Sequence, residues 1–473
     1  MTAESTPSRS THGVRKIALI QTTHLGTARP QIGLGVGFLK SYLGTHAPAR
    51  FEIDTYESND FLSNMHKASE YDVIAISTVS YLYDIAKKIA RDVKSNLGDQ
   101  VTTIVGGVHI TSAPETLSAD FDYGAVGEGE QTFLEFITAL DRGASDDELL
   151  RIPGIVARRD GKLSRVAARD FISDIETIPF PDREMFNRYR AVPSLITARG
   201  CPFKCDFCTN NVLWTRNVRK PSPVRVAEEL ADVVAKINDV RVIVFRDDIV
   251  FIKEDYVQLV YESLAERYPH ILAIPKVGYA HVNTLRPQFA QLLKDLGITK
   301  ILCGFESGSQ RILKILKAGS ATVENNQRAA DICSAIDLDI AGNFIIGTPD
   351  EEEEDVVATY DFLLKNLRAG KIKNASTSIL TPFPGERYWK IFLDSGEDLA
   401  TFDWSRLNET GFPTYYEDTG GRGTVREWWQ ERKAQGKIYI GKIPEDRFVD
   451  IVQRYEPEVI ALQKEYLKTD RKY

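Results

Sequence analysis

The chain lacks the features that membrane and secreted proteins require. No run of about 18 consecutive apolar residues occurs, so the sequence predicts no membrane-spanning helix. Residues 1–15 are rich in Ser and Thr and have no apolar stretch of the kind found in a secretory signal. We therefore expect a disordered tail at 1–15 and a cytoplasmic protein.

An overall excess of positive charge is also missing. The 473 residues include 59 Lys and Arg against 67 Asp and Glu, which gives a formal net charge of −8. Nucleic acids and anionic lipids are bound by patches of Lys and Arg. This balance argues against a nucleic-acid or membrane partner.

Cysteine is scarce, with five residues in the whole chain. Cys201, Cys205 and Cys208 fall within one short segment, a clustering that a metal site explains better than a disulfide framework does. Cys303 and Cys333 lie in an expected strand and an expected helix, where we predict small buried hydrophobic residues.

Residues 16–145 alternate short β-rich runs with helical patterns. Strands are expected at 16–21, 51–56, 72–77, 101–105 and 123–127, and helices at 33–43, 86–96 and 131–140. This alternation predicts a parallel sheet with helices on both faces, which is a Rossmann-like α/β domain. Ligands of such sheets bind outside the carboxyl ends of the strands, where residues 22–27, 77–81 and 106–111 would gather.

The rest of the chain is expected to form a connector, a second α/β domain and a cap. Prolines cluster at 146–190, which predicts the connector. Six strands are then expected at 194–198, 242–245, 273–279, 300–305, 339–346 and 376–381, with helices opening at Ser222, Thr284 and Thr322. Six β-α units predict a partial (β/α)6 TIM-type barrel over 191–390. Residues 391–473 are expected to form a small, mainly helical C-terminal cap.

The three clustered cysteines form a Cys-x3-Cys-x2-Cys loop directly after an expected strand. Thiolates are soft anionic ligands, and three on one tight loop can reach three corners of an iron-sulfur cubane while the fourth iron keeps no protein ligand. A structural zinc site needs a fourth Cys or His nearby, yet the next His is His270. Zinc and a coincidental cluster of reduced thiols stay open as alternatives.

This loop, with Phe207 before its last cysteine, resembles the hallmark of the radical S-adenosylmethionine superfamily. The resemblance implies a [4Fe-4S] cluster on Cys201, Cys205 and Cys208, whose open iron chelates the methionyl part of S-adenosylmethionine. The reduced cluster would break the sulfonium bond and release a 5′-deoxyadenosyl radical. It also implies a small-molecule substrate and an electron donor such as a flavodoxin or ferredoxin, or a reductase partner.

Further segments resemble superfamily motifs at the expected strand ends. Phe207 would lie against the adenine, and Glu386 stands where the sixth-strand motif usually has Thr. The other residues that the resemblance assigns to cosubstrate binding are Asp247, Asp248, Glu306, Ser307, Ile345, Ile346 and Thr381. The acidic residues among them have a structural alternative, because strand-end carboxylates often cap the next helix.

The N-terminal domain joined to such a barrel resembles the cobalamin-binding class of the superfamily. Ser77, and Gly106 with Gly107, match two of three pieces of the cobalamin signature. The third piece, Asp-x-His-x-x-Gly, is absent, so His24 is not expected to bind cobalt. The glycines either let a nucleotide tail approach the backbone or form a tight turn, and both interpretations stay open.

Three functional hypotheses remain. With cobalamin bound, the resemblance implies hydrogen abstraction followed by methylation of an unactivated carbon or phosphorus, in secondary-metabolite or antibiotic biosynthesis. Without cobalamin, it implies radical dehydration or epimerisation, as in dehydratases of aminoglycoside sugars, with Glu386 or Tyr388 as the general acid. The third hypothesis is a non-catalytic redox or cobalamin sensor.

Overall fold

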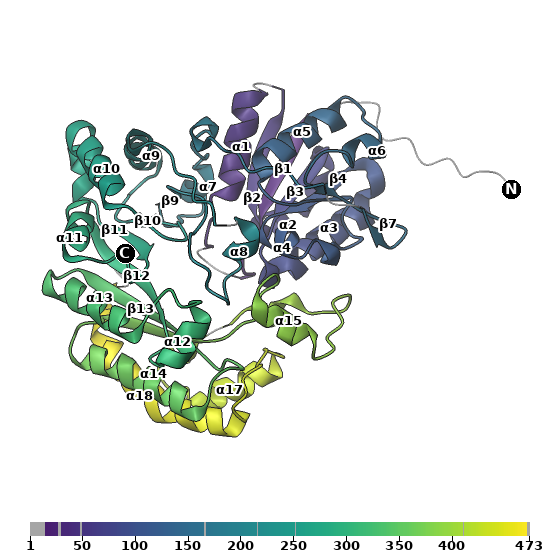
Figure 1. Ribbon diagram of the computed structural model, residues 1–473. Helices are drawn as coiled ribbons and strands as arrows, with labels where there is room; N and C mark the ends of the chain where they lie inside the picture. Colours follow the sequence, from purple (N-terminus) through teal and green to yellow (C-terminus); the bar gives the residue numbers. More distant parts are fainter. Residues whose placement is uncertain are drawn as a thin grey trace. The chain divides into compact units, whose positions relative to one another are not determined.

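The computed structural model describes residues 15–26, 30–47, 50–164, 167–214, 216–250, 252–409 and 411–470. The chain divides into two compact units (Figure 1). The first unit is Met1–Val192 with Asp398–Ser405, and the second is Pro193–Glu397 with Arg406–Tyr473. Of the tail expected at 1–15 only Arg15 is described, and Thr27 also lies outside the described residues.

The first unit contains a six-stranded sheet in the order β2-β1-β3-β4-β5-β6. All neighbouring strands are parallel except β6, which runs antiparallel to β5. Since β1 lies between β2 and β3, the winding reverses between β1 and β3, and ligands of such sheets bind outside the carboxyl ends at this point. The strands are β1 (Lys16–Gln21), β2 (Glu52–Glu57), β3 (Val73–Ser77), β4 (Thr102–Gly106), β5 (Tyr123–Ala125) and β6 (Ile155–Val156).

Helices cover both faces of this sheet, as expected for a Rossmann-like domain. Four consecutive residues of β1, from Ile17 to Ile20, are each at most 1% exposed, which requires cover on both sides. Figure 1 shows α1 beside α5. The helices are α1 (Gly35–His46), α2 (Ser58–Ser63), α3 (Tyr83–Leu97), α4 (Val108–Ser112), α5 (Gly129–Asp141), α6 (Asp146–Leu149) and α7 (Glu184–Arg188).

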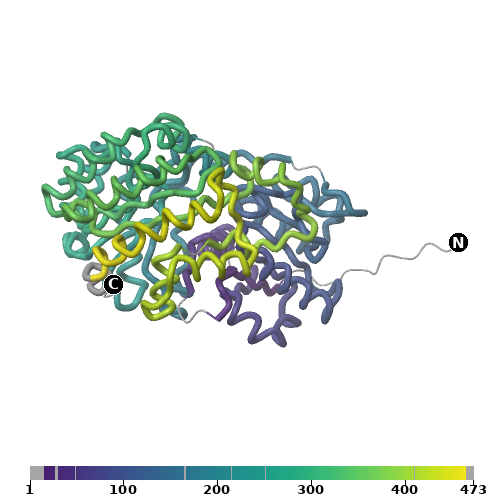
Figure 2. The backbone as a smooth tube through the Cα atoms, turned by 90° about the horizontal axis from the view of Figure 1, so that it is seen from below, coloured from purple at the N-terminus to yellow at the C-terminus, as the bar shows by residue number. Residues whose placement is uncertain are grey.

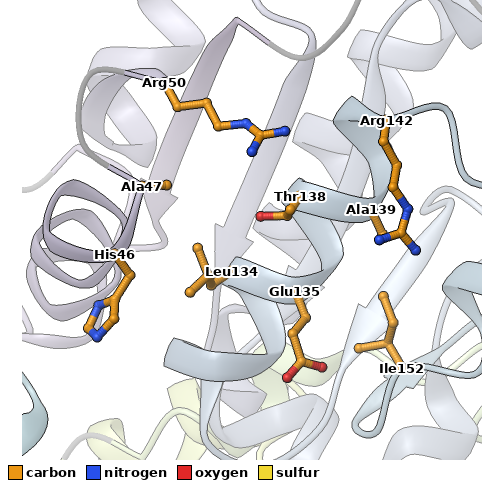
Figure 3. Close-up of a pocket in the computed structure, with 9 residues that line it drawn as sticks. All are labelled: His46, Ala47, Arg50, Leu134, Glu135, Thr138, Ala139, Arg142 and Ile152. Atoms are coloured by element: carbon orange, nitrogen blue, oxygen red, sulfur yellow. The ribbon is translucent and has the colours of Figure 1, made fainter.

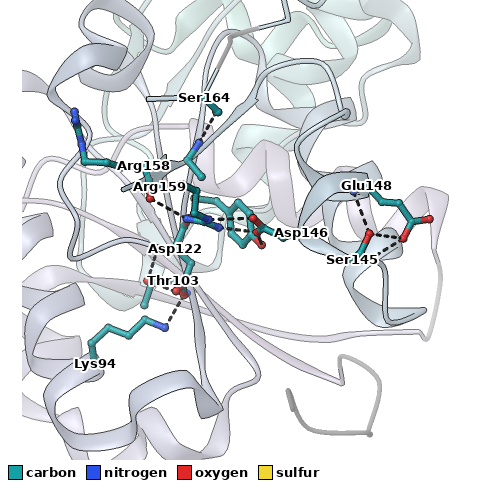
Figure 4. Close-up of polar contacts among 11 residues, drawn as sticks. Lys94, Thr103, Asp122, Ser145, Asp146, Glu148, Arg158, Arg159 and Ser164 are labelled. Atoms are coloured by element: carbon teal, nitrogen blue, oxygen red, sulfur yellow. Dashed lines mark hydrogen bonds and ion pairs between the residues drawn. The ribbon is translucent and has the colours of Figure 1, made fainter. Parts of the chain in front are cut away.

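The segment expected to be a separate connector, 146–190, belongs to the first unit instead. It supplies β6 and the hairpin of β7 (Arg158–Arg159) and β8 (Lys162–Leu163). Ion pairs hold this edge of the unit, with Arg159 on Asp146 at 2.6 Å and Lys94 on Asp122 at 2.6 Å (Figure 4). Strands of two residues are too short to produce a periodic sequence pattern, which is why the prediction missed them.

The second unit contains six parallel strands in the order β14-β13-β12-β11-β10-β9. Neighbours in the sheet are neighbours in sequence, and helices connect the strands, which is the arrangement of the expected partial barrel. The strands are β9 (Ser194–Leu195), β10 (Ile243–Phe245), β11 (Lys276–Ala280), β12 (Ile298–Glu306), β13 (Asp339–Ile346) and β14 (Asn374–Ile379).

Strand β13 has the predicted bounds, whereas the other five strands of this sheet differ from theirs, most clearly the first and the third. The first strand ends at Leu195 instead of residue 198, because the chain turns there into the cysteine loop. The third begins at Lys276 instead of residue 273, since Pro269–Ala273 forms a 3-10 helix.

Two of the three helix starts predicted for the second unit are correct. Ser222 and Thr322 accept hydrogen bonds from backbone N–H groups of the following turns, so both are helix caps. The prediction for Thr284 is wrong, because α11 begins at Pro287, whose ring fixes a helical φ. The helices are α8 (Asn210–Leu213), α9 (Pro223–Lys236), α10 (Glu254–Arg267), α11 (Pro287–Asp295), α12 (Gln310–Leu316), α13 (Val323–Ala335), α14 (Glu353–Arg368), α15 (Arg387–Leu393), α16 (Phe412–Asp418), α17 (Val425–Ala434) and α18 (Glu445–Asp470).

The C-terminal region is mainly helical, as expected, but it is not one cap. Helix α18 packs along α14 (Figure 2). Between the two helices the rings of Tyr360 and Tyr455 stack with their centroids 5.0 Å apart. Residues 398–405 join the first unit instead, where the Trp404 ring packs edge-on against His109 at 4.3 Å. Among the described residues, no helix combines the length and apolar character that crossing a membrane would need.

Candidate active site

The cysteine loop is closed at its base by backbone pairing. Arg199 and Arg219 exchange two backbone hydrogen bonds, at 2.9 and 3.0 Å, in an antiparallel bridge. Gly200 has a φ of +106°, and a Cβ at this position would collide with the carbonyl oxygen of Asn217. Only glycine therefore allows the chain to leave β9 and enter the loop in this way.

The upper part of the loop is held by one side chain. Asn211, on α8, donates from Nδ2 to the carbonyl oxygens of Cys205 at 3.1 Å and Cys208 at 3.2 Å. These bonds fix the backbone that carries the cysteines and leave the thiols available.

The three thiols are partly exposed and close enough to affect one another. Burial raises the pKa of Cys205 and Cys208 to about 11 and also raises the pKa of Cys201. The charge of a neighbouring thiolate of the loop raises each of these pKa values further. Thiols of this kind ionise when a metal supplies the compensating positive charge. No three His, Cys, Asp or Glu side chains in the described part of the chain form a site for a single metal ion, as zinc would need. A cubane has no such requirement, because each thiolate binds its own iron.

The loop is also fixed to the barrel wall. The backbone N–H of Asp206 donates to the carbonyl oxygen of Leu316 on α12 at 2.8 Å. The next residue, Phe207, packs together with Ile345 against one hydrophobic cluster. That cluster consists of Ile312, Leu316, Leu380 and Tyr388.

The two aspartates after β10 have different surroundings. Asp247 is buried, and its Oδ1 accepts from the N–H groups of Thr197 at 2.9 Å and Ala198 at 2.6 Å, so it ties β10 to the start of the cysteine loop. Its Oδ2 is buried with no partner among the described residues, and burial raises its pKa to about 7. Asp248 is exposed, and its charge contributes to the raised pKa of Cys201 and Cys208. Neither aspartate caps α10, which starts after Lys253.

Glu306 is turned back over the inner face of the barrel at the end of β12. It has a φ of +59°, and the register of β12 against β13 shifts between Gly304 and Glu306. A Cβ on Gly304 would collide with Oε1 of Glu306, so the glycine makes room for this carboxylate. Glu306 does not cap α12, because Ser309 does so.

Lys317 forms a buried ion pair with this glutamate. Its Nζ lies 3.1 Å from Oε1 of Glu306, and the two side chains are 6% and 7% exposed. Burial alone would lower the pKa of Lys317, but the Glu306 carboxylate together with Cys205 and Cys303 more than offsets this and raises it. The charge of the Lys317 ammonium also lowers the pKa of Cys205, so it acts on the cysteine site.

The remaining expected cosubstrate residues have different surroundings. Ser307 is fully buried and its hydroxyl bonds to Thr359 Oγ1 at 2.9 Å, so this side chain has a structural partner. Ile345 lies on the face with Phe207, whereas Ile346 is 2% exposed and lies on the other face. Thr381 is half-buried at the end of β14, where its hydroxyl donates to the carbonyl oxygen of Ile379 at 3.4 Å.

The two residues considered as general acids lie at the start of α15. Glu386 caps this helix by accepting from the N–H of Tyr388 at 2.8 Å, which explains an acidic residue here. Its Oε1 is buried without a partner among the described residues, and burial raises its pKa to about 8. Tyr388 is fully buried and donates to Asp350 Oδ2 at 2.9 Å, and burial also raises its pKa.

In the first unit, Ser77, Gly106 and Gly107 lie at the carboxyl edge of the sheet, beside the β1–β3 reversal. Ser77 pairs with Gly106 in adjacent strands. Gly107 has a φ of +96°, and a Cβ on it would lie 2.6 Å from the carbonyl oxygen of Thr78. At Gly106 a Cβ would meet only ordinary contacts, 3.6 Å from Ala125. Gly107 is thus required by the turn, whereas Gly106 leaves space that the protein does not fill.

A cavity of about 510 Å³ in the first unit is lined by residues from the ends of α1 and α5, including His46, Arg50 and Arg142 (Figure 3). These helices run back from the carboxyl ends of their strands, so their C-terminal ends lie at the amino edge of the sheet. The cavity therefore lies at the amino edge of the sheet, whereas a ligand bound beside Gly106 would lie at the carboxyl edge.

Sequence reasoning missed three residues that shape the cysteine site. They are Lys317, Asn211 and His281, whose ring stacks on Phe203 of the cysteine loop at 3.7 Å. None of them stands in a recognisable spacing, and only the fold brings them to the loop.

Comparison with known proteins defines the family. Residues 195–363 match the model of the radical SAM superfamily, and residues 39–137 match that of the B12 binding domain. An uncharacterized methyltransferase, PH0819, of Pyrococcus horikoshii is 30% identical over 394 residues, covering 81% of this chain and 82% of the relative.

The chain belongs to the radical S-adenosylmethionine superfamily, in the class with a B12-binding domain.

Two further proteins are similar to this radical SAM enzyme over most of its length. The anaerobic magnesium-protoporphyrin IX monomethyl ester cyclase of Rubrivivax gelatinosus is 27% identical, over 71% of this chain and 60% of the cyclase. The structure of the cobalamin-dependent S-adenosylmethionine radical enzyme OxsB with aqua-cobalamin bound superposes with a TM-score of 0.69 at 18% identity, over 95% of this chain and 72% of OxsB. This likeness confirms the predicted fold class.

Membership implies a [4Fe-4S] cluster, S-adenosylmethionine and cobalamin as cofactors of this radical SAM enzyme, and two of these can be tested on the residues present. Cys201, Cys205 and Cys208 fit the cluster, because they are three thiols on one fixed loop. Gly106 fits a cobalamin tail, because a Cβ there would occupy space that no other described group fills.

Proposed function

We propose that this radical SAM enzyme is a methyltransferase that abstracts a hydrogen atom from a small polar metabolite and methylates the resulting carbon radical, with cobalamin as the methyl carrier. The observation that carries the proposal is the loop of three cysteines, which has no fourth protein ligand among the described residues and stands beside two carboxylates at the carboxyl ends of the barrel strands. The B12 model match at 39–137 and the methyltransferase name of the Pyrococcus horikoshii relative support the methyl-transfer branch.

The protein's own residues prepare this chemistry by fixing positions. When bound, the cofactors supply an electron, a deoxyadenosyl radical and a methyl group. Asn211 and the Arg199–Arg219 bridge hold the loop, so that the three thiolates keep one geometry. Asp248 and Glu306 lie close to the thiols, where carboxylates can bind the ammonium group of S-adenosylmethionine.

The inner face of the barrel would bind adenine through apolar contact. Phe207 and Ile345 present half-buried surfaces that pack on one cluster, which is the environment an aromatic base requires. Glu386 and Tyr388 are engaged in capping α15 and in binding Asp350, so in this proposal they shape the wall beside the site and are not the general acids of a dehydration.

The test is anaerobic reconstitution of the full chain with iron, sulfide and hydroxocobalamin, followed by S-adenosylmethionine carrying a deuterated methyl group and a strong reductant. We expect 5′-deoxyadenosine and a labelled methyl group on the corrinoid, both measured by mass spectrometry. The variant with all three loop cysteines changed to Ala should form neither product. The matched control is Cys333→Ala, which removes a buried thiol of α13 and should keep both products.

The outcomes separate the competing hypotheses. Formation of 5′-deoxyadenosine without retained corrinoid would favour the dehydration or epimerisation branch. A full cluster that never cleaves S-adenosylmethionine would favour a sensor. If the triple Ala variant still made 5′-deoxyadenosine, the assignment of the cysteines would be wrong.

A further inference from the structure

A buried lysine beside the cysteine loop has no role in the functions considered so far. Lys317 directly follows α12, and its side chain is 6% exposed. Burying an ammonium group is costly unless the charge is paired, so its position requires a specific partner. The only acceptor within ion-pair distance among the described residues is Glu306, with Nζ 3.1 Å from Oε1.

Both side chains occupy the space above one glycine of β12. A Cβ added to Gly304 would collide with Oε1 of Glu306 and would lie 3.2 Å from Nζ of Lys317. Any larger residue at 304 would therefore separate the pair. The backbone of Glu306 is in the left-handed region, at a φ of +59°, which a residue other than glycine adopts only when its surroundings hold it there.

The backbone around Lys317 fixes this pair relative to the cysteine loop. The carbonyl oxygen of Leu316, the residue before Lys317, accepts from the N–H of Asp206, the residue after Cys205, at 2.8 Å. The main chain next to Lys317 is thus tied to the cluster loop through one hydrogen bond. Glu306 has no other side-chain partner among the described residues, so the lysine is the group that orients the carboxylate.

We propose that Lys317 is a positioning residue, which holds the Glu306 carboxylate over Gly304 and directs it toward the cosubstrate bound at the cysteine loop. This inference rests on the proposed function, because it assumes that Glu306 contacts S-adenosylmethionine. Outer partners that orient a binding group commonly contribute about 10- to 100-fold to affinity or activity when they are removed.

The experiment measures binding of S-adenosylmethionine to the full reconstituted chain. The cosubstrate is titrated against the reduced cluster, and the change in its electron paramagnetic resonance spectrum gives the dissociation constant. We expect Lys317→Met to bind four irons per chain and to lose about 10- to 100-fold in affinity. Lys317→Arg keeps the charge and should restore most of the loss. Lys314→Met removes an exposed lysine of the same helix and should match the wild type.

A double-mutant comparison shows whether the lysine acts through the glutamate. In the Glu306→Gln background, adding Lys317→Met should change the affinity less than twofold, because the carboxylate that it positions is already gone. This pair of variants also replaces a buried ion pair by neutral groups, so it remains informative if Lys317→Met alone fails to fold.

Two results would overturn the inference. One is wild-type affinity in a Lys317→Met protein with a full complement of iron, and the other is an equal loss from Lys317→Met with and without the Glu306 carboxylate. Failure of the wild-type protein to bind S-adenosylmethionine at all would instead contradict the proposed function.

Discussion

The two adjacent glycines at the end of β4 are expected to respond to the same substitution in opposite ways. Gly107 has a φ of +96° and a ψ of −167°, a region that only glycine occupies without strain of about 1–3 kcal/mol. A Cβ there would also lie 2.6 Å from the carbonyl oxygen and 2.9 Å from the nitrogen of Thr78. Strain and overpacking together predict that Gly107→Ala destabilises the first unit by roughly 2–5 kcal/mol.

Gly106 lies in a regular strand position, and its added Cβ would stay 3.6 Å from Ala125. Gly106→Ala should therefore change the free energy of unfolding by less than about 1 kcal/mol. If the space beside Gly106 receives the nucleotide tail of cobalamin, the same methyl group should lower the affinity for the corrinoid about tenfold or more. The carboxyl edge of the sheet would then be the binding edge, as the β1–β3 reversal predicts.

Two assays measure these effects separately. Urea unfolding monitored by circular dichroism gives the stability of each variant, and titration with hydroxocobalamin followed by visible absorption gives the affinity. Wild-type corrinoid affinity in Gly106→Ala would refute the inference that the nucleotide tail occupies the space beside Gly106. Unchanged stability in Gly107→Ala would refute the claim that only glycine fits this turn.

Two further predictions concern buried groups away from the cysteine loop. Trp404 is 1% exposed and packs on Tyr83 and His109. Trp404→Ala should therefore destabilise the first unit by about 3–5 kcal/mol, measured by urea unfolding. As a control, Leu25→Ala changes an exposed residue and should alter the stability little. The Glu456 carboxyl accepts a hydrogen bond from the Tyr360 hydroxyl at 2.9 Å, and burial raises the pKa of Glu456 from 4.5 to about 7. Between these two pH values the native state therefore keeps a proton that the unfolded chain releases. Stability of the second unit should therefore fall by about 3 kcal/mol as pH rises from about 4.5 to 7, and unfolding of Glu456→Gln at both ends of this range should lack that fall.

Much of the fold follows from local patterns in the sequence. Strand β13 has its predicted bounds because left-handed turn residues, Asp337 and Gly347, stand just outside both of its ends. The caps Ser222 and Thr322 mark the starts of their helices directly. The segments whose structure the sequence did not predict are those that depend on contacts with residues far away in the chain. Residues 155–156 form a strand only because β5 offers an unpaired edge, and 398–405 joins the first unit only because Trp404 finds His109 there.

The candidate site was predictable where chemistry requires a fixed spacing, and not elsewhere. The spacing of Cys201, Cys205 and Cys208 identifies the cluster loop because three thiolates must reach one cubane. Lys317 has no such signature, since it meets Glu306 only through the return of α12 to the sheet. Ile346 illustrates the opposite error, because an adjacent residue in a strand points to the other face.

The central claim is that one iron of the cluster is left without a protein ligand and binds S-adenosylmethionine. Electron-nuclear double resonance of the reduced, reconstituted chain with S-adenosylmethionine labelled by ¹⁵N in its amino group measures this contact directly. We predict a ¹⁵N coupling that disappears when the three cysteines are changed to Ala. A fully assembled cluster with no ¹⁵N coupling, or with a fourth side chain on that iron, would contradict the account.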